Sequence, residues 1–142
     1  MLAKRIPQKI SAIIGLAPAP DFPKLLIWDK MSGSEKRKLV KNRMTSIKYE
    51  DGSKNNFSYK LIKDSFKNLT LSKSITFNGP VYLYHGMADD AVPYDLSIKI
   101  IKNFKGTKDI KLLLEKDAGH RLSETHQLHK ITDIIQEIKT KI

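Results

Sequence analysis

Three short apolar runs constrain the fold of this chain more than any other feature. They are Lys9–Ala17, Pro80–His85 and Ile110–Glu115, and each is rich in apolar and β-branched side chains. Proline, glycine or aspartate residues lie at their ends, which is typical of strands. Because their apolar character is continuous rather than alternating, we expect them to form a parallel sheet that is covered on both faces.

Helical patterns follow the second and third of these runs. Pro93–Phe104 and Ser123–Ile142 both repeat apolar residues at the spacing of one helix face, and Ser123 is a candidate N-cap. The order strand, helix, strand, helix predicts right-handed βαβ units. The sequence therefore indicates an α/β fold with a mostly parallel sheet of three main strands and flanking helices.

A long stretch of different character, residues 21–77, separates the first two runs. A charged helical segment near Ser34–Lys41 precedes two alternating segments around the turn Asp51-Gly52, which predicts a helix and a hairpin. The alternating residues are Thr45, Ile47, Tyr49, Phe57, Tyr59 and Leu61, and the apolar residues before them are Phe22, Leu25, Leu26, Ile27 and Trp28. The apolar group either lines an acyl-chain pocket or packs a helix onto the sheet. We expect a lid-like insertion within a single domain of residues 1–142.

Composition excludes several classes of protein. The chain has no cysteine and no apolar run as long as the roughly 18 residues of a membrane span. It also lacks a convincing metal-ligand spacing and a secretory signal pattern, so we expect a cytoplasmic protein without a metal or other cofactor. The net charge of +11 raises the possibility of nucleic-acid binding. However, 22 of the 26 basic residues are Lys scattered along the chain, which argues against sequence-specific recognition.

Two loops carry the residues with catalytic potential. One follows the second run and reads HGMADDAVP from His85, and the other follows the third run and reads DAGHRLS from Asp117. Open α/β sheets place their sites at the carboxyl ends of parallel strands. Asp89 in the first loop and His120 in the second can therefore meet, with the carboxylate accepting the imidazole N–H.

These loops resemble the HG-x-x-D-x-x-V-P and G-H loops of α/β-hydrolases. The upstream segment AIIGLAPAPDF, from Ala12, is also similar to this superfamily, and the likeness is greatest to small bacterial serine esterases and a related mitochondrial acyl-protein thioesterase. The resemblance implies a partial α/β-hydrolase fold with Asp89 as the triad acid, Asp90 as the second choice and His120 as the general base. Trp28, Met87 and Leu122 would then contact an acyl ester or thioester substrate.

The nucleophile that this resemblance requires is missing from the 142 residues. No G-x-S-x-G motif occurs, and Ser32 and Ser34 beside Gly33 lie in a polar connection rather than on a strand-to-helix turn. We therefore interpret the chain as the C-terminal half of a hydrolase, and we expect the isolated chain to be inactive.

A half-fold has consequences for assembly. We expect the edge of the first strand to be exposed and to be covered either by a homo-oligomer or by a complementing N-terminal half. Two other functions remain open, a non-catalytic binding or scaffold module and a basic protein associated with nucleic acid.

Overall fold

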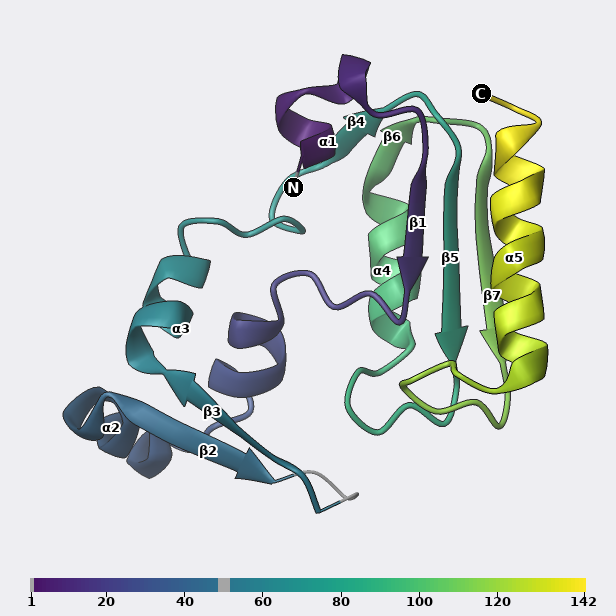
Figure 1. Ribbon diagram of the computed structural model, residues 1–142. Coiled ribbons are helices and arrows are strands. Elements are labelled where there is room, and N and C mark those ends of the chain that lie inside the picture. The colour runs from purple at the N-terminus through teal and green to yellow at the C-terminus, as the bar shows by residue number, and fades with distance from the viewer. Residues whose placement is uncertain (1, 49–51) are drawn as a thin grey trace. The chain divides into compact units, whose positions relative to one another are not determined.

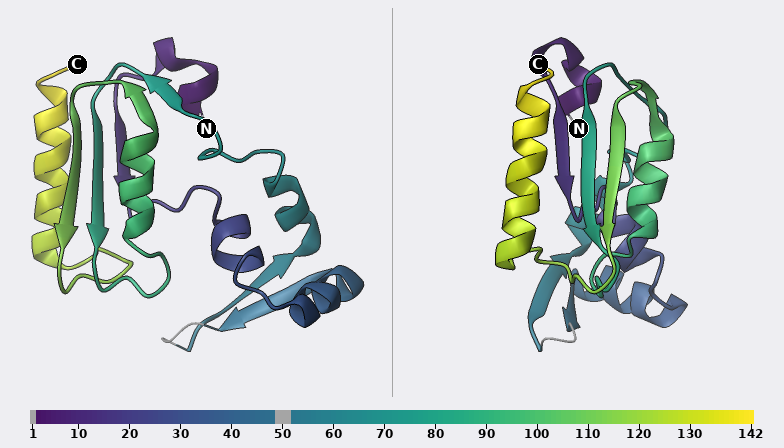
Figure 2. Two further views of the ribbon diagram at one scale, coloured as in Figure 1. Left: turned by 180° about the vertical axis from the view of Figure 1, so that it is seen from behind. Right: turned by 90° about the vertical axis from the view of Figure 1, so that its right-hand side faces the viewer.

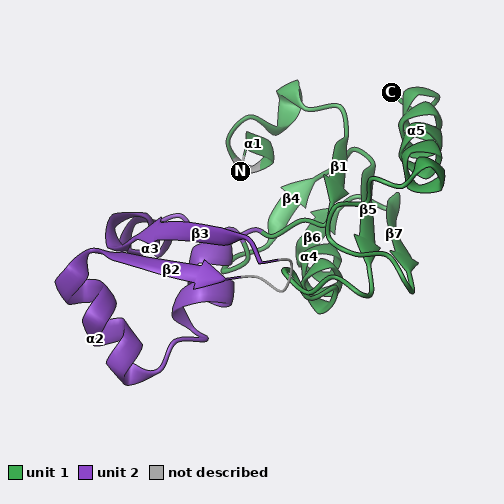
Figure 3. Ribbon diagram, turned by 60° about the horizontal axis from the view of Figure 1, so that its bottom comes forward, with its two compact units in different colours: residues 1–19, 71–142 green, residues 20–70 purple. Residues whose placement is uncertain are grey.

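The computed structural model describes residues 2–48 and 52–142, which divide into two compact units (Figure 3). The first unit consists of residues 1–19 and 71–142, and the second of residues 20–70. Residues 71–77, which the sequence analysis assigned to the insertion, thus group with the first unit. Among the helices in the described parts of the chain, none is both long enough and apolar enough to cross a membrane.

The first unit is built on a three-stranded parallel sheet (Figure 1). Its strands are β1 (Ile13–Leu16), β5 (Val81–Gly86) and β7 (Ile110–Glu115), in the order β1-β5-β7. The predicted parallel sheet is confirmed. The prediction that the first strand begins at Lys9 is wrong, because Pro7–Lys9 forms a 3-10 turn, η1, that the Ile10 amide closes by donating to the Pro7 carbonyl.

Two helices cover opposite faces of this sheet (Figure 2), as continuous apolar strands require. They are α4 (Asp95–Asn103) and α5 (Thr125–Lys139), which match the two predicted helices. The prediction that Ser123 is the N-cap of the second helix is wrong. Glu124 caps α5 instead, because its side chain and that of Gln127 form a reciprocal capping box with the backbone.

A second, smaller parallel pair in this unit was not predicted. It joins β4 (Ile75–Phe77) to β6 (Phe104–Gly106), and α1 (Leu2–Arg5) lies against β4. Phe104 is buried, and so are Ile75 and Phe77 at the two ends of β4. This pair extends the apolar core beyond the three main strands.

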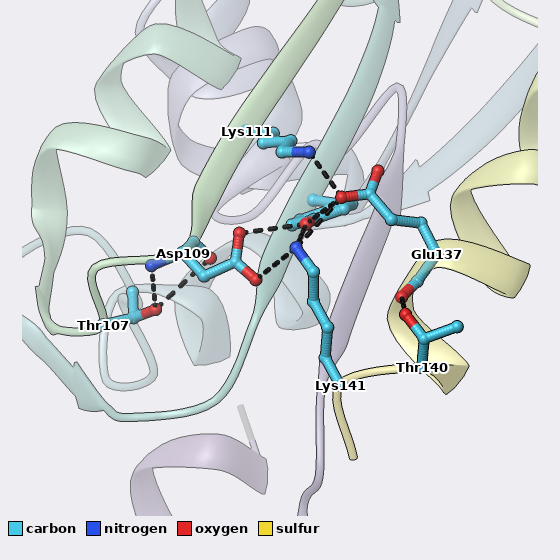
Figure 4. A network of polar contacts seen from close by, with 7 residues as sticks. Thr107, Asp109, Lys111, Glu137, Thr140 and Lys141 are labelled. Atoms are coloured by element: carbon cyan, nitrogen blue, oxygen red, sulfur yellow. Dashed lines mark hydrogen bonds and ion pairs between the residues drawn. The ribbon is translucent and has the colours of Figure 1, made fainter.

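A polar network anchors the C-terminal end of α5 to the sheet (Figure 4). The Tyr82 hydroxyl lies 2.9 Å from Asp109 Oδ1 and 2.7 Å from Glu137 Oε1, and Lys141 donates to it. Lys111 donates to Glu137 over 2.5 Å. The hydrogen bonds that Glu137 accepts from Lys111, Tyr82 and Lys141, that of Lys111 first, lower its pKa to about 2 and so keep its carboxylate charged at neutral pH.

The second unit contains the predicted helix and hairpin. Its elements are η2 (Pro23–Trp28, one π-helical segment), α2 (Gly33–Asn42), β2 (Met44–Lys48), β3 (Lys54–Ser58) and α3 (Tyr59–Ser65). Tyr59 and Leu61, predicted as strand residues, lie in a helix because the Ser58 hydroxyl caps it by accepting the Leu61 amide. Tyr49 and Asp51 of the predicted hairpin lie outside the described residues.

The second unit has its own core. Ile27, Leu39 and Ile62 are buried together, and Trp28 packs at their margin against the Phe66 ring at 5.8 Å and the Tyr59 ring at 6.3 Å. The two ends of this unit are tied to each other, because the Thr70 amide donates to Asp21 Oδ1 over 2.6 Å.

Candidate active site

The candidate site lies where β5 and β7 end. The loop after β5 carries Asp89, and the loop after β7 carries His120. Since the two strands are parallel neighbours, with His85 beside Leu114 and Gly86 beside Glu115, both loops leave the same edge of the sheet. This is the position that open α/β sheets use for binding and catalysis.

Asp89 and His120 are brought together as the sequence predicted. The distance from Asp89 Oδ2 to His120 Nδ1 is 2.8 Å, a good length for a charge-assisted hydrogen bond. The Asp89 side chain is fully buried, whereas 45% of the His120 side chain is exposed. The pair thus combines a shielded carboxylate with an imidazole that solvent can reach.

The Asp89 carboxylate is saturated with hydrogen bonds. Oδ1 accepts the backbone amides of Ala91 at 3.0 Å and Val92 at 2.8 Å. Oδ2 accepts His120 and also lies 3.1 Å from His85 Nε2. Four donors on two oxygens satisfy the hydrogen-bonding capacity of this buried carboxylate.

The hydrogen bond to Asp89 determines which ring nitrogen of His120 carries the proton. A carboxylate accepts only, so Nδ1 of His120 must carry the proton that it donates. In the neutral ring, Nε2 then holds the free lone pair. An imidazole with this tautomer and a buried carboxylate behind it has the arrangement of a general base in acyl transfer.

Gly86 allows the two loops to meet. A Cβ atom at this position would lie 2.0 Å from the Ala118 carbonyl oxygen and 2.8 Å from that of Gly119. The loops are joined directly beside it, because the Ala88 amide donates to the Ala118 carbonyl over 3.0 Å. Only a glycine permits this approach without a shift of the His120 loop.

Glu115 connects the two ends of the His120 loop, at β7 and at α5. It ends β7 and accepts Lys130 Nζ and His126 Nε2 of α5, each over 2.6 Å, as well as the Tyr84 hydroxyl. These bonds, with that of Lys130 first, lower the pKa of Glu115 to about 2. The loop is therefore fixed where it leaves the sheet and where it enters the helix.

The other predicted site residues lie in different environments. Asp90 and Met87 are both exposed in the loop after β5. Leu122 is buried beside Ala17 and Tyr84, with a positive φ of 47°. Trp28 belongs to the core margin of the second unit. The substrate-binding roles assigned to Met87, Leu122 and Trp28 remain predictions.

The two serines beside Gly33 have a structural role. Ser32 is the N-cap of α2, accepting the Glu35 amide over 3.3 Å, and its Oγ lies 3.0 Å from Ser34 Oγ. This agrees with the expectation that neither lies on a nucleophile turn. Within residues 2–48 and 52–142, no cluster of three or more His, Cys, Asp or Glu side chains could hold a metal ion.

Two residues of the site were missed at the sequence level. The sequence motifs did not single out His85, the first residue of the HGMADDAVP loop, or Ser97 in α4 as site residues. Both are completely buried and in contact, with His85 Nδ1 at 2.6 Å from Ser97 Oγ. The sequence feature that could have pointed to Ser97 is its position beside Leu96, on the apolar face of the predicted helix.

The fold of the chain is similar to those of solved structures. A protein from Agrobacterium vitis S4 described as a hydrolase superposes with a TM-score of 0.86 at 28% identity, covering 96% of this chain and 56% of that one. Mouse alpha/beta hydrolase domain-containing protein 10 superposes with a TM-score of 0.88 at 24% identity, covering 99% and 56%. The chain has the fold of an α/β-hydrolase.

The family can be stated more closely. Residues 31–139 match the Prolyl oligopeptidase family, and the chain belongs to it. Curated relatives include the mitochondrial palmitoyl-protein thioesterase ABHD10 of Homo sapiens, 29% identical over 140 residues, and that of Bos taurus, 30% identical over 142. Each match covers 94% of this chain and 45% of the relative. The chain thus spans about half the length of these relatives.

Proposed function

We propose that this chain contributes the acid and the histidine of a serine hydrolase site that cleaves carboxylic esters or acyl thioesters. The observation that carries the proposal is the 2.8 Å hydrogen bond between buried Asp89 and exposed His120. His120 would take the proton of a nucleophile hydroxyl through Nε2 and return it to the leaving group. Asp89 would stabilise the imidazolium that forms in between.

The choice of acyl substrates rests on the relatives. ABHD10 is named a palmitoyl-protein thioesterase, and the resemblance of the two loops points to the same chemistry. Since none of the 142 residues forms a G-x-S-x-G motif, the nucleophile and oxyanion donors would come from polypeptide outside them. The cytoplasm is the predicted compartment, although these relatives are named as mitochondrial.

Hydrolysis of p-nitrophenyl butyrate and palmitoyl-CoA tests the proposal. The 142-residue chain and the longest polypeptide that its gene encodes are assayed side by side. We expect the longer product, or a complex of the chain with a separately encoded half, to hydrolyse at least one substrate, and the chain alone to remain at the buffer rate. Turnover by the chain alone would contradict the external nucleophile, and a longer product or complex that is inactive on both substrates would contradict the function.

We also propose that another polypeptide covers the β1 side of the sheet. Ile14 and Leu16 of β1 are 38% and 45% exposed. Among the described residues, β1 pairs with β5 alone. In preparations of the 142-residue chain, a second copy would cover this apolar edge; in the complete hydrolase, the segment with the nucleophile would do so.

Light scattering after size exclusion tests this edge. We expect the chain to elute above its monomer mass of 16.2 kDa and Leu16→Lys to shift towards that mass, because a charge on the edge opposes pairing. Ile142→Lys, at an apolar residue of the terminus that is more exposed than Leu16, serves as the control and should leave the elution unchanged. A wild-type chain that is entirely monomeric would overturn the proposal of self-association.

A further inference from the structure

Of the four histidines, all of which lie in the described parts of the chain, only His85 is completely buried, and the proposed proton transfer does not use it. It lies in β5, just before Gly86. Its Nε2 lies 2.9 Å from the Val92 carbonyl oxygen and 3.1 Å from Asp89 Oδ2, and its Nδ1 lies 2.6 Å from Ser97 Oγ. Both ring nitrogens therefore have partners within hydrogen-bond distance.

The chemistry of these partners determines the tautomer of His85. A carbonyl and a carboxylate only accept hydrogen bonds, so Nε2 must carry a proton and donate it. In the neutral ring, Nδ1 then accepts the hydroxyl proton of Ser97. The hydrogen bonds thus run in one direction, from Ser97 in α4 through His85 to Asp89.

We propose that His85 is a positioning residue for the triad acid, an inference that rests on the proposed function. Backbone amides hold Asp89 Oδ1, and His85 holds one side of Oδ2. The carboxylate is left with one direction in which Oδ2 can accept a further donor, and His120 occupies it. His85 thereby fixes the carboxylate rotation that keeps His120 in the Nδ1–H tautomer.

The tautomers can be read directly by nitrogen-15 NMR of the histidine-labelled 142-residue chain. Long-range proton–nitrogen correlations show which ring nitrogen carries the proton. We expect Nε2–H for His85 and Nδ1–H for His120 at neutral pH. A His85 ring protonated on Nδ1 alone, or a neutral His120 protonated on Nε2, would overturn the proposal without any variant.

Variants of His85 distinguish a role in positioning Asp89 from a contribution to the stability of the fold. His85→Phe keeps the bulk but removes the donor, so His120 should change to a mixture of tautomers. His85→Gln keeps an N–H near the position of Nε2 and should restore the Nδ1–H form. Val81→Ala, a fully buried change in the same strand, controls for lost stability and should leave the His120 tautomer unchanged. A folded His85→Phe protein with the wild-type His120 tautomer would refute the role.

Kinetics of the complete hydrolase give a second readout. We expect His85→Phe to lower kcat about 10–100-fold with little change in KM, by analogy with the loss of an outer hydrogen-bond partner of a metal-binding side chain. His85→Gln should recover most of this loss. If the tautomers are as expected but the complete protein hydrolyses no acyl substrate, the hydrolase proposal fails while the hydrogen-bonded arrangement stands.

Discussion

Replacing His120 with alanine should lower kcat/KM for acyl hydrolysis by the complete protein by a factor on the order of 10⁴–10⁶. The reason is that His120 is the exposed member of the pair and would carry the proton in both half-reactions. Asp89→Asn should cost about 10⁴-fold, because an amide N–H facing Nδ1 favours the wrong tautomer. Progress curves with p-nitrophenyl butyrate measure both effects.

The neighbouring carboxylate provides a matched control. Asp90 precedes Ala91 in the same loop, but its side chain is exposed, and the carboxylate bonded to His120 Nδ1 is that of Asp89. Asp90→Asn should therefore leave kcat/KM within a few-fold of the wild-type value. If Asp90→Asn were as damaging as Asp89→Asn, the assignment of the acid would be wrong.

Gly86→Ala should separate the two loops of the site. The added methyl group would lie 2.0 Å from the carbonyl oxygen of Ala118, a backbone atom that cannot turn aside as a side chain can. The His120 loop must move, and the hydrogen bond from the Ala88 amide to Ala118 is lost with it. We expect a loss of about 1–3 kcal/mol or more in the free energy of unfolding. Guanidinium denaturation followed by circular dichroism measures this loss.

Gly119 offers the same substitution in an open position. A Cβ atom there would have no heavy atom within 4 Å beyond its chain neighbours. Gly119→Ala, next to His120, should change the unfolding free energy by less than about 1 kcal/mol, and in the stabilising direction if at all. Equal denaturation midpoints for the Gly86 and Gly119 variants would show that close approach of the loops is not what Gly86 provides.

The main sheet was predictable because its strands are continuous apolar runs, a pattern that few other structures produce. The short pair β4 and β6 was not, since three residues carry no periodicity. Tyr59 and Leu61 continued an alternating pattern, but one capping hydroxyl at Ser58 was sufficient to start a helix there. Local hydrogen bonds of this kind override a weak hydrophobic period.

The site was predictable in part for a related reason. Asp89 and His120 follow neighbouring parallel strands, so topology alone places their loops at one edge. The contact between His85 and Ser97 depends on how β5 and α4 pack, which spacing along the chain does not reveal. Likewise, the sequence ranked Asp89 above Asp90 by motif, whereas the physical distinction between them is burial.

The hydrogen bond between Asp21 and Thr70 has a consequence for how this protein can vary. It closes residues 20–70 into a module whose two ends meet, while the hydrogen-bonded set around Asp89 lies wholly in the other unit. Insertions, deletions or exchange of sequence between these ends need not alter the path of the chain on either side. The sequence of this module and that of the loops around Asp89 are therefore separate stretches of the chain, each free to diverge at its own rate.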